Sequence, residues 1–133
     1  MNKYGYDWNS LLEPGTIVCS HYSNFDGTRC DGVFMIIYDE QNDMYNIDKK
    51  NVLAIKVSTK STCITNYSVP VSIEKNNFLN ENCIACCNKI HTLHKTKEVY
   101  RVLGKLDSGT YKRIFKTISK VLSEIARQNV EVL

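Results

Sequence analysis

Short apolar segments separated by polar clusters fill the chain between residues 16 and 106. β-Branched and aromatic residues dominate these segments, which is typical of β-strands. The segments that we predict as strands are residues 16–22, 33–38, 51–59, 67–74 and 99–106, with residues 82–87 as a further candidate. Pro70 lies in the fourth segment, and because proline cannot donate to a strand ladder we expect this segment at a sheet edge or a bulge.

The hydrophobic period changes after residue 106. Apolar side chains then recur at three- and four-residue steps, the pattern of one face of an amphipathic helix. They are Tyr111, Ile114, Phe115, Ile118, Val121, Leu122 and Ile125. Asp107 or Ser108 can cap this helix, which we place at residues 107–128. The order of elements predicts an α+β domain, a small antiparallel barrel with a C-terminal helix packed on it.

A polar segment at residues 23–32 separates the first two predicted strands. It contains Asn, Asp and two glycines between apolar runs, so we predict a loop of about ten residues. Long loops in compact domains often carry function. This loop is therefore the first candidate for a site.

Composition narrows the class of protein only a little. A chain of 133 residues is the size of one domain. The formal charge of +3 permits a nucleic-acid partner without requiring one. No window holds the roughly 20 apolar residues that a membrane span needs, so we expect a cytoplasmic protein without a membrane partner.

Three cysteines and two histidines crowd the stretch "NCIACCNKIHTLHK" at residues 82–95. Thiolates and imidazoles are zinc ligands. Ile84 and Ala85 suit a strand, however, in which Cys83 and Cys86 face opposite sides instead of sharing a metal. We therefore expect free, buried thiols and no metal or other cofactor, and we place a turn at residues 88–95.

The same stretch resembles the C-terminal half of the MazF/PemK toxins. In that family a buried strand runs into a Gln-Ile-Arg-Thr-Ile-Asp-type segment, then a Gly-x-Leu strand and a terminal helix, here "CIACCNKIHTLHK", "GKL" and the helix. "EPGTIVCSHY" is similar to the opening strand of the family, "VFMIIY" to its central strand, and "AIKVST" to the strand that ends in a catalytic Thr or Ser. The resemblance covers residues 14–124.

The resemblance implies an SH3-like β-barrel of the MazF/PemK and CcdB type. Residues 1–133 then form one domain, with residues 1–13 as an N-terminal extension. Members of the family are cytosolic homodimers, and most are metal-independent endoribonucleases that an antitoxin neutralises. This chain is accordingly expected to bind and cleave single-stranded RNA and to have an antitoxin or another protein as its partner.

The site residues of the family carry over with changes. Its catalytic arginine, which precedes the central strand, corresponds to Asp31, followed by Gly32. Arg29 is the nearest substitute, and Ser58 matches the strand-end hydroxyl. The family's glutamine and arginine of the Gln-Ile-Arg-Thr segment become Lys89 and His91.

Histidine is the commonest general acid or base, so the expected catalytic residues are Arg29, Ser58 and His91, with His21 as a further candidate. The expected groove lies between residues 23–32 and 58–62. Its basic, aromatic and hydroxyl groups would contact RNA phosphates and bases. The expected substrate-binding residues are Tyr22, Phe25, Thr59, Lys60 and Lys89.

In a second hypothesis the chain has the same fold but does not cleave RNA. Because Asp31 supplies no positive charge where the family has arginine, the chain is alternatively an inactive binding module of a phage or mobile element. Such a module would inhibit or dock on another protein. The orientation of Arg29, toward Ser58 or toward solvent, discriminates between the two hypotheses.

Overall fold

A computed structural model describes residues 11–24, 26–40, 50–59 and 65–132. Six strands precede one helix in this part of the chain. The elements are β1 (Thr16–Ser23), β2 (Arg29–Asp39), β3 (Asn51–Ser58), β4 (Ser68–Val71), β5 (Cys83–His94), β6 (Val99–Lys105) and α1 (Ser108–Val132). No helix among the described residues is long and apolar enough to cross a membrane.

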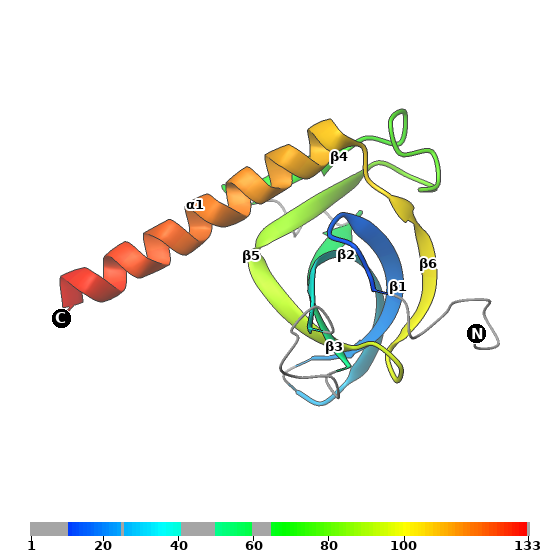
Figure 1. Ribbon diagram of the computed structural model, residues 1–133, viewed down its shortest axis with the longest axis horizontal. Helices are drawn as coiled ribbons and strands as arrows, with labels where there is room; N and C mark the ends of the chain where they lie inside the picture. Colours follow the sequence, from blue (N-terminus) through cyan, green and yellow to red (C-terminus); the bar gives the residue numbers. More distant parts are fainter. Residues whose placement is uncertain (1–10, 25, 41–49, 60–64, 133) are drawn as a thin grey trace.

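The strands form one antiparallel sheet in the order β4-β5-β3-β2-β1-β6. The sheet curls strongly, and α1 lies across one end of it (Figure 1). The predicted α+β class, with strands followed by a helix, is confirmed. The sheet does not close by hydrogen bonds, since β4 and β6 remain its two edges. Pro70 lies in edge strand β4, as its missing N–H requires.

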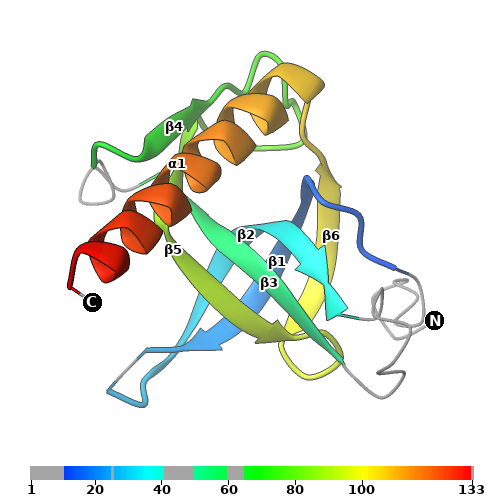
Figure 2. The same cartoon turned by 60° about the vertical axis from the view of Figure 1, so that its left-hand side comes forward.

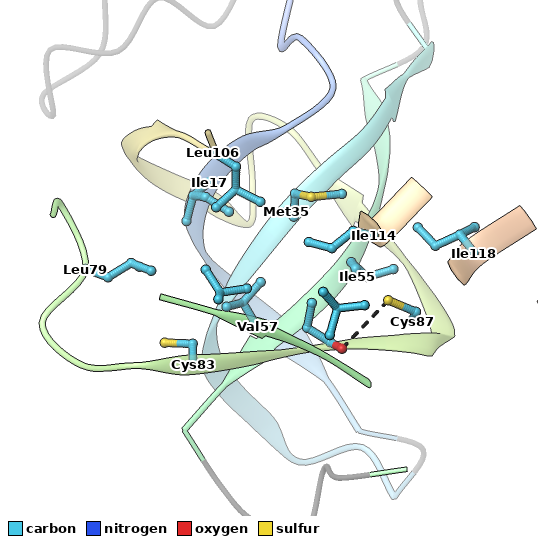
Figure 3. Packing of buried hydrophobic residues seen from close by; sticks show 13 residues of the cluster. Ile17, Met35, Ile55, Val57, Leu79, Cys83, Cys87, Leu106, Ile114 and Ile118 are labelled. Atoms are coloured by element: carbon cyan, nitrogen blue, oxygen red, sulfur yellow. Dashed lines mark hydrogen bonds between the residues drawn. The ribbon is translucent and has the colours of Figure 1, made fainter. Parts of the chain in front are cut away.

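Hydrophobic side chains pack on both faces of the sheet. One face, which we call the helix face, carries Ile17, Met35 and Ile55 and packs against Ile114 and Ile118 of α1 (Figure 3). Because these side chains are almost fully buried, the first turns of the helix are fixed to the sheet.

The opposite face holds a second apolar cluster. Its core residues include Val18, Phe34, Ile36, Ala54 and Leu93, all fully buried. Side chains that alternate along β1 and β2 therefore enter two separate environments. Two adjacent residues near the end of a strand consequently lie on opposite faces of the sheet.

Helix α1 begins after a side-chain cap. The backbone N–H of Thr110 donates to Asp107 Oδ2 at 3.1 Å, and Asn76 Nδ2 donates to Asp107 Oδ1 at 3.0 Å. The cap satisfies an N–H that the first turn leaves unpaired, so the predicted role of Asp107 is confirmed. The later turns of the helix extend past the sheet (Figure 2), where Leu122 and Ile125 are about half exposed.

The predicted ten-residue loop is shorter than expected. Strand β1 continues to Ser23 and β2 already begins at Arg29, so the polar residues at 29–32 are part of the ladder. Gly27 has a φ of 87° and donates its N–H to the Asn24 carbonyl at 2.9 Å, which closes a tight turn. Because the turn is compact, the side chains near it are placed by strand register.

Strand β5 replaces the turn that we predicted at residues 88–95. It runs from Cys83 to His94, and its pairing with β3 shifts from Val57↔Ala85 to Ile55↔Ile90. Residues 86–89 thus lie opposite Lys56. This irregularity in the pairing lets polar residues lie within the strand. The cysteines of the strand are free and buried as expected.

Candidate active site

The β1–β2 hairpin carries one cluster of reactive side chains near its turn. The ladder places His21 opposite Asp31, Tyr22 opposite Cys30 and Ser23 opposite Arg29. Since side chains alternate between the two faces of the sheet, His21 and Asp31 project to the same side. Tyr22, the neighbour of His21, projects to the other side.

His21 is held by contacts from two strands. Its Nδ1 pairs with Asp31 Oδ1 from β2, and its ring lies 4.6 Å, centroid to centroid, from the ring of Tyr100 in β6. The imidazole is one-third exposed and the Asp31 carboxyl about two-thirds exposed. When His21 is neutral with its proton on Nδ1, Nδ1–H donates a hydrogen bond to the carboxylate and Nε2 presents a lone pair. Nε2 forms no hydrogen bond within the described part of the chain.

The pair opens into a surface hollow of about 290 Å³ that Arg29 also lines. Its lining consists of His21, Arg29, Cys30 and Asp31. The Arg29 side chain is exposed, and no ion pair holds it among the residues that the structure describes. The hollow therefore combines an oriented imidazole with a guanidinium, a proton acceptor and a donor for phosphate oxygens.

A second hollow, of about 220 Å³, lies on the opposite side of the hairpin. We call it the Lys56 hollow. It is polar, with two lysines, two amides, a phenol and an imidazole in its lining. These residues are Tyr22, Asn24, Lys56, Asn88, Lys89 and His91. Lys56 Nζ donates to the Tyr22 hydroxyl at 2.6 Å.

His91 lies at the base of the Lys56 hollow against two aromatic rings. Its ring centroid is 5.8 Å from that of Tyr22 and 5.2 Å from that of Phe34, both at edge-to-face angles. Burial lowers the pKa of His91, and the charges of Lys89 and Lys56 lower it further. His91 is therefore neutral at pH 7.

The three predicted catalytic residues do not share one hollow. Arg29 lines the hollow of His21, whereas His91 lines the Lys56 hollow. Ser58 is buried at the end of β3, opposite Ile84 of β5, and it lines neither hollow. The chain thus brings Arg29 together with His21, the further candidate, instead of with Ser58 or His91.

The predicted substrate-binding residues also divide. Tyr22 and Lys89 lie together in the Lys56 hollow. Thr59 is exposed and lines a third hollow, of about 410 Å³, with Cys19 and Arg101. Phe25 and Lys60 lie outside the described residues.

Sequence reasoning missed Lys56 as a site residue. The sequence did indicate this residue, since Lys56 is the one charged residue of the strand "NVLAIKVS" and has apolar neighbours on both sides. A lysine in such a strand must keep its ammonium in water or beside a polar partner, here the Tyr22 hydroxyl. The pairing of His21 with Asp31 was missed for a different reason, because the loop between them was predicted too long.

The part of the chain that the structure describes contains no group of three or more His, Cys, Asp or Glu side chains arranged to hold a metal ion. Cys83 and Cys87 pack in the cluster on the helix face, while Cys86 lines the Lys56 hollow. The cysteines of β5 thus face opposite sides, as strand geometry predicts. Burial raises the pKa of Cys87 to about 11, so its thiol stays protonated.

Solved structures that are similar to this arrangement of strands and helix include MazF toxins. MazF from Deinococcus radiodurans has a TM-score of 0.65 at 8% identity, over 86% of this chain and 98% of that chain. The chain has the MazF fold. An endoribonuclease in complex with its cognate antitoxin from a mycobacterial species has a TM-score of 0.61 at 16% identity, over 84% and 95% of the two chains. Toxin MazF-mt6 from Mycobacterium tuberculosis has a TM-score of 0.54 at 16% identity, over 79% and 96%.

At these identities the likeness concerns the fold. No family model matches the sequence, and no curated protein matches it. Asp31, which the sequence resemblance matches to the family's arginine, carries a carboxylate that pairs with His21. Arg29 lies two residues before it along β2.

Proposed function

We propose that the protein is a MazF-like endoribonuclease that cleaves single-stranded RNA without a metal ion. The observation that carries the proposal is the shared hollow of the His21–Asp31 pair and Arg29. The MazF fold supports it, because the solved structures with this fold include proteins described as endoribonucleases. Ser58 and His91 lie elsewhere, so the proposal gives the chemical step to His21 and Arg29.

The reaction is a transesterification within the RNA. Nε2 of neutral His21 takes the proton of a ribose 2′-hydroxyl, and the resulting oxygen attacks the adjacent phosphorus. The bond between phosphorus and the 5′-oxygen of the next nucleotide breaks. The products are a 2′,3′-cyclic phosphate and a 5′-hydroxyl, whose proton comes from water or from protonated His21.

Arg29 and Asp31 stabilise the charges that develop on the phosphate and on the imidazole during the reaction. The guanidinium of Arg29 donates hydrogen bonds to the non-bridging phosphate oxygens, where negative charge increases in the transition state. The Asp31 carboxylate stabilises the imidazolium that forms when His21 accepts its proton. Side chains thereby supply both the base and the cation, so the step needs no metal-bound water.

The proposal extends to partners. Two of the similar structures are forms of a MazE–MazF complex, and one is an endoribonuclease in complex with its cognate antitoxin. We therefore propose an antitoxin as the protein partner of this chain. We also propose a homodimer, because Leu122 and Ile125 leave apolar surface on α1 uncovered.

Cleavage of a short single-stranded RNA by purified protein tests the function. We expect fragments that end in a 2′,3′-cyclic phosphate, in EDTA as well as in buffer. An RNA with a 2′-deoxy substitution at the cut position should stay intact, because its nucleophile is missing. Cleavage of the deoxy substrate, or loss of all activity in EDTA, contradicts the mechanism.

Two observations favour the second hypothesis, a binding module. A carboxylate stands at position 31, where the family's arginine is expected, and the exposed Arg29 lines a hollow that does not include Ser58. If the protein fails to cleave any RNA at high concentration, the folded chain is better described as a module that docks on another protein.

A further inference from the structure

The Lys56 hollow has no role in the cleavage step proposed above, yet its lining is polar and specific. It lies on the opposite side of the β1–β2 hairpin from His21. Three strands contribute to it: Tyr22 from β1, Lys56 from β3 and His91 from β5. Packed strands fix these side chains, so the hollow is built into the fold.

Its positive charge is held in place. Lys56 is half-buried and donates to the Tyr22 hydroxyl at 2.6 Å, while Lys89 is exposed at the rim. The shift of register between β3 and β5 leaves residues 86–89 opposite Lys56, so the ladder opens at this point. Two ammonium groups around one opening favour an anionic ligand such as a phosphate.

Its neutral polar groups suit a base. Asn24 and Asn88 are exposed at the opening, and a side-chain amide carries both donors and an acceptor, as the edge of a nucleobase does. The His91 ring is fixed by edge-to-face contacts with Tyr22 and Phe34. Because burial and the two lysines keep His91 neutral, it also offers one donor and one acceptor.

We propose that the Lys56 hollow binds one unstacked nucleotide of the RNA substrate, with Lys56 and Lys89 at its phosphate and Asn88 at the edge of its base. The inference rests on the proposed function in taking RNA as the ligand. Proteins recognise single-stranded RNA in this way, by splaying out bases and hydrogen-bonding their edges. The hollow of about 220 Å³ is smaller than the roughly 300–1,000 Å³ of sites for drug-sized ligands, which fits one base and its phosphate.

The position of the Lys56 hollow relative to His21 suggests how a bound nucleotide affects cleavage. His21 and Tyr22 are consecutive in β1, and each lines one of the two hollows. An RNA strand that passes the end of the hairpin meets both, so a nucleotide held at Lys56 sets which phosphate reaches His21. The Lys56 hollow thereby determines the sequence preference of cleavage.

Two variants test the two halves of the assignment. Lys56→Met keeps the apolar stem of the side chain and removes its charge, with Lys116→Met on the exposed face of α1 as the control. Asn88→Ala removes the amide, with the exposed Asn66→Ala as the control. Asn24 is unsuitable because its backbone closes the hairpin turn through Thr28 and Gly27.

The first measurement is the salt dependence of binding to an RNA whose 2′-hydroxyls are all replaced by 2′-O-methyl groups, so that it cannot be cleaved. Loss of one phosphate contact should lower the slope of log K against log salt by about 0.7 for Lys56→Met and leave it unchanged for Lys116→Met. An unchanged slope for Lys56→Met overturns the assignment.

The second measurement compares binding of 2′-O-methyl RNAs that differ at one base. Asn88→Ala should reduce the preference at one position about tenfold, whereas Asn66→Ala should not. A change in slope with no change in base preference leaves a phosphate site only and overturns the nucleotide assignment. If both variants behave as expected while unmodified RNA is never cleaved, the nucleotide site stands and the nuclease proposal fails. If RNA is cleaved and both variants match the wild type, the nuclease proposal stands and the nucleotide site fails.

Discussion

Asp31 lies directly opposite His21 in the β1–β2 ladder, and its carboxylate pairs with Nδ1 of the imidazole. The pair is fixed by backbone register, since a slip of one residue would send the two side chains to different faces of the sheet. Tyr100 of β6 contacts the same imidazole ring. The orientation of His21 therefore depends on three strands at once.

Replacement of His21 by alanine should lower the rate of RNA cleavage about 10²- to 10⁴-fold, because the positioned base is lost. Single-turnover cleavage at saturating protein measures the effect. Asp31→Asn should lower the same rate with little change in KM, because it removes charge from a group that acts through His21. His94→Ala, at the last residue of β5, is the matched control and should cleave at the wild-type rate. Equal rates for His21→Ala and His94→Ala would exclude His21 as the base.

Replacement of Arg29 by alanine should lower cleavage about 10²- to 10³-fold, as expected when one transition-state donor is removed. Arg29→Lys should recover part of the rate, since a charge remains without the forked geometry of guanidinium. Arg127→Ala, an exposed arginine on α1, controls for the loss of one positive charge. A wild-type rate for Arg29→Ala would leave the phosphate without its proposed cation.

Much of the fold could be predicted from the sequence, because local patterns report it directly. Period-two and period-3.6 apolar positions located β1, β3, β6 and α1 closely, and Pro70 indicated an edge. The length of the first hairpin loop could not be predicted, since polar residues at 29–32 extend β2 only through pairing with β1. The same holds for the second half of β5, whose polar side chains face hollows instead of a core.

The candidate site was less predictable than the fold. Residue types indicated Arg29, His21 and His91 individually, but their grouping depends on which face each strand position occupies. His21 and Tyr22 are consecutive in β1, and this step of one residue places them in different hollows. The face that a residue occupies follows from the register of the sheet, and this register is set by the pairing of the strands in the folded chain.

The low pKa of His91 should make the protein less stable in acid. Burial, Lys89 and Lys56 lower this pKa from the usual 6.5, so the unfolded chain binds the proton at a higher pH than the folded chain. Stability present above pH 6.5 is therefore lost as the pH falls from 6.5 toward the lowered pKa, and no further loss from this group occurs below it. Urea unfolding at several pH values should show a shallower loss for His91→Gln than for the wild type. A parallel loss in both proteins would contradict the assignment.

The ion pair of Lys95 with Asp39 should be sensitive to removal of one partner. Lys95 Nζ lies 2.7 Å from Asp39 Oδ2, and both side chains are almost fully buried. Asp39 also accepts the backbone N–H of Leu12 at 2.8 Å. Asp39→Ala should lower the free energy of unfolding by about 3–5 kcal/mol, because one partner of a buried ion pair is removed while the Lys95 ammonium stays buried.

Urea unfolding measures this loss, and removal of the exposed pair between Lys105 and Glu13 is the matched control. Glu13→Ala should lower the free energy of unfolding much less than Asp39→Ala, because water screens an exposed pair. Equal losses at the two sites would show that burial of the Lys95 pair has no special effect on stability.

The break in the β3–β5 ladder lets the sequence change at this point without a change in the alignment of the two strands. Val57↔Ala85 and Ile55↔Ile90 hold the two strands on either side of it, so Asn88 and Lys89 are free of pairing with β3. Substitutions or transplants confined to these two positions alter the chemistry at the opening of the Lys56 hollow while the neighbouring ladder keeps its alignment. This segment is therefore where related proteins can diverge in ligand preference without rebuilding the sheet, and where an engineer can exchange one preference for another.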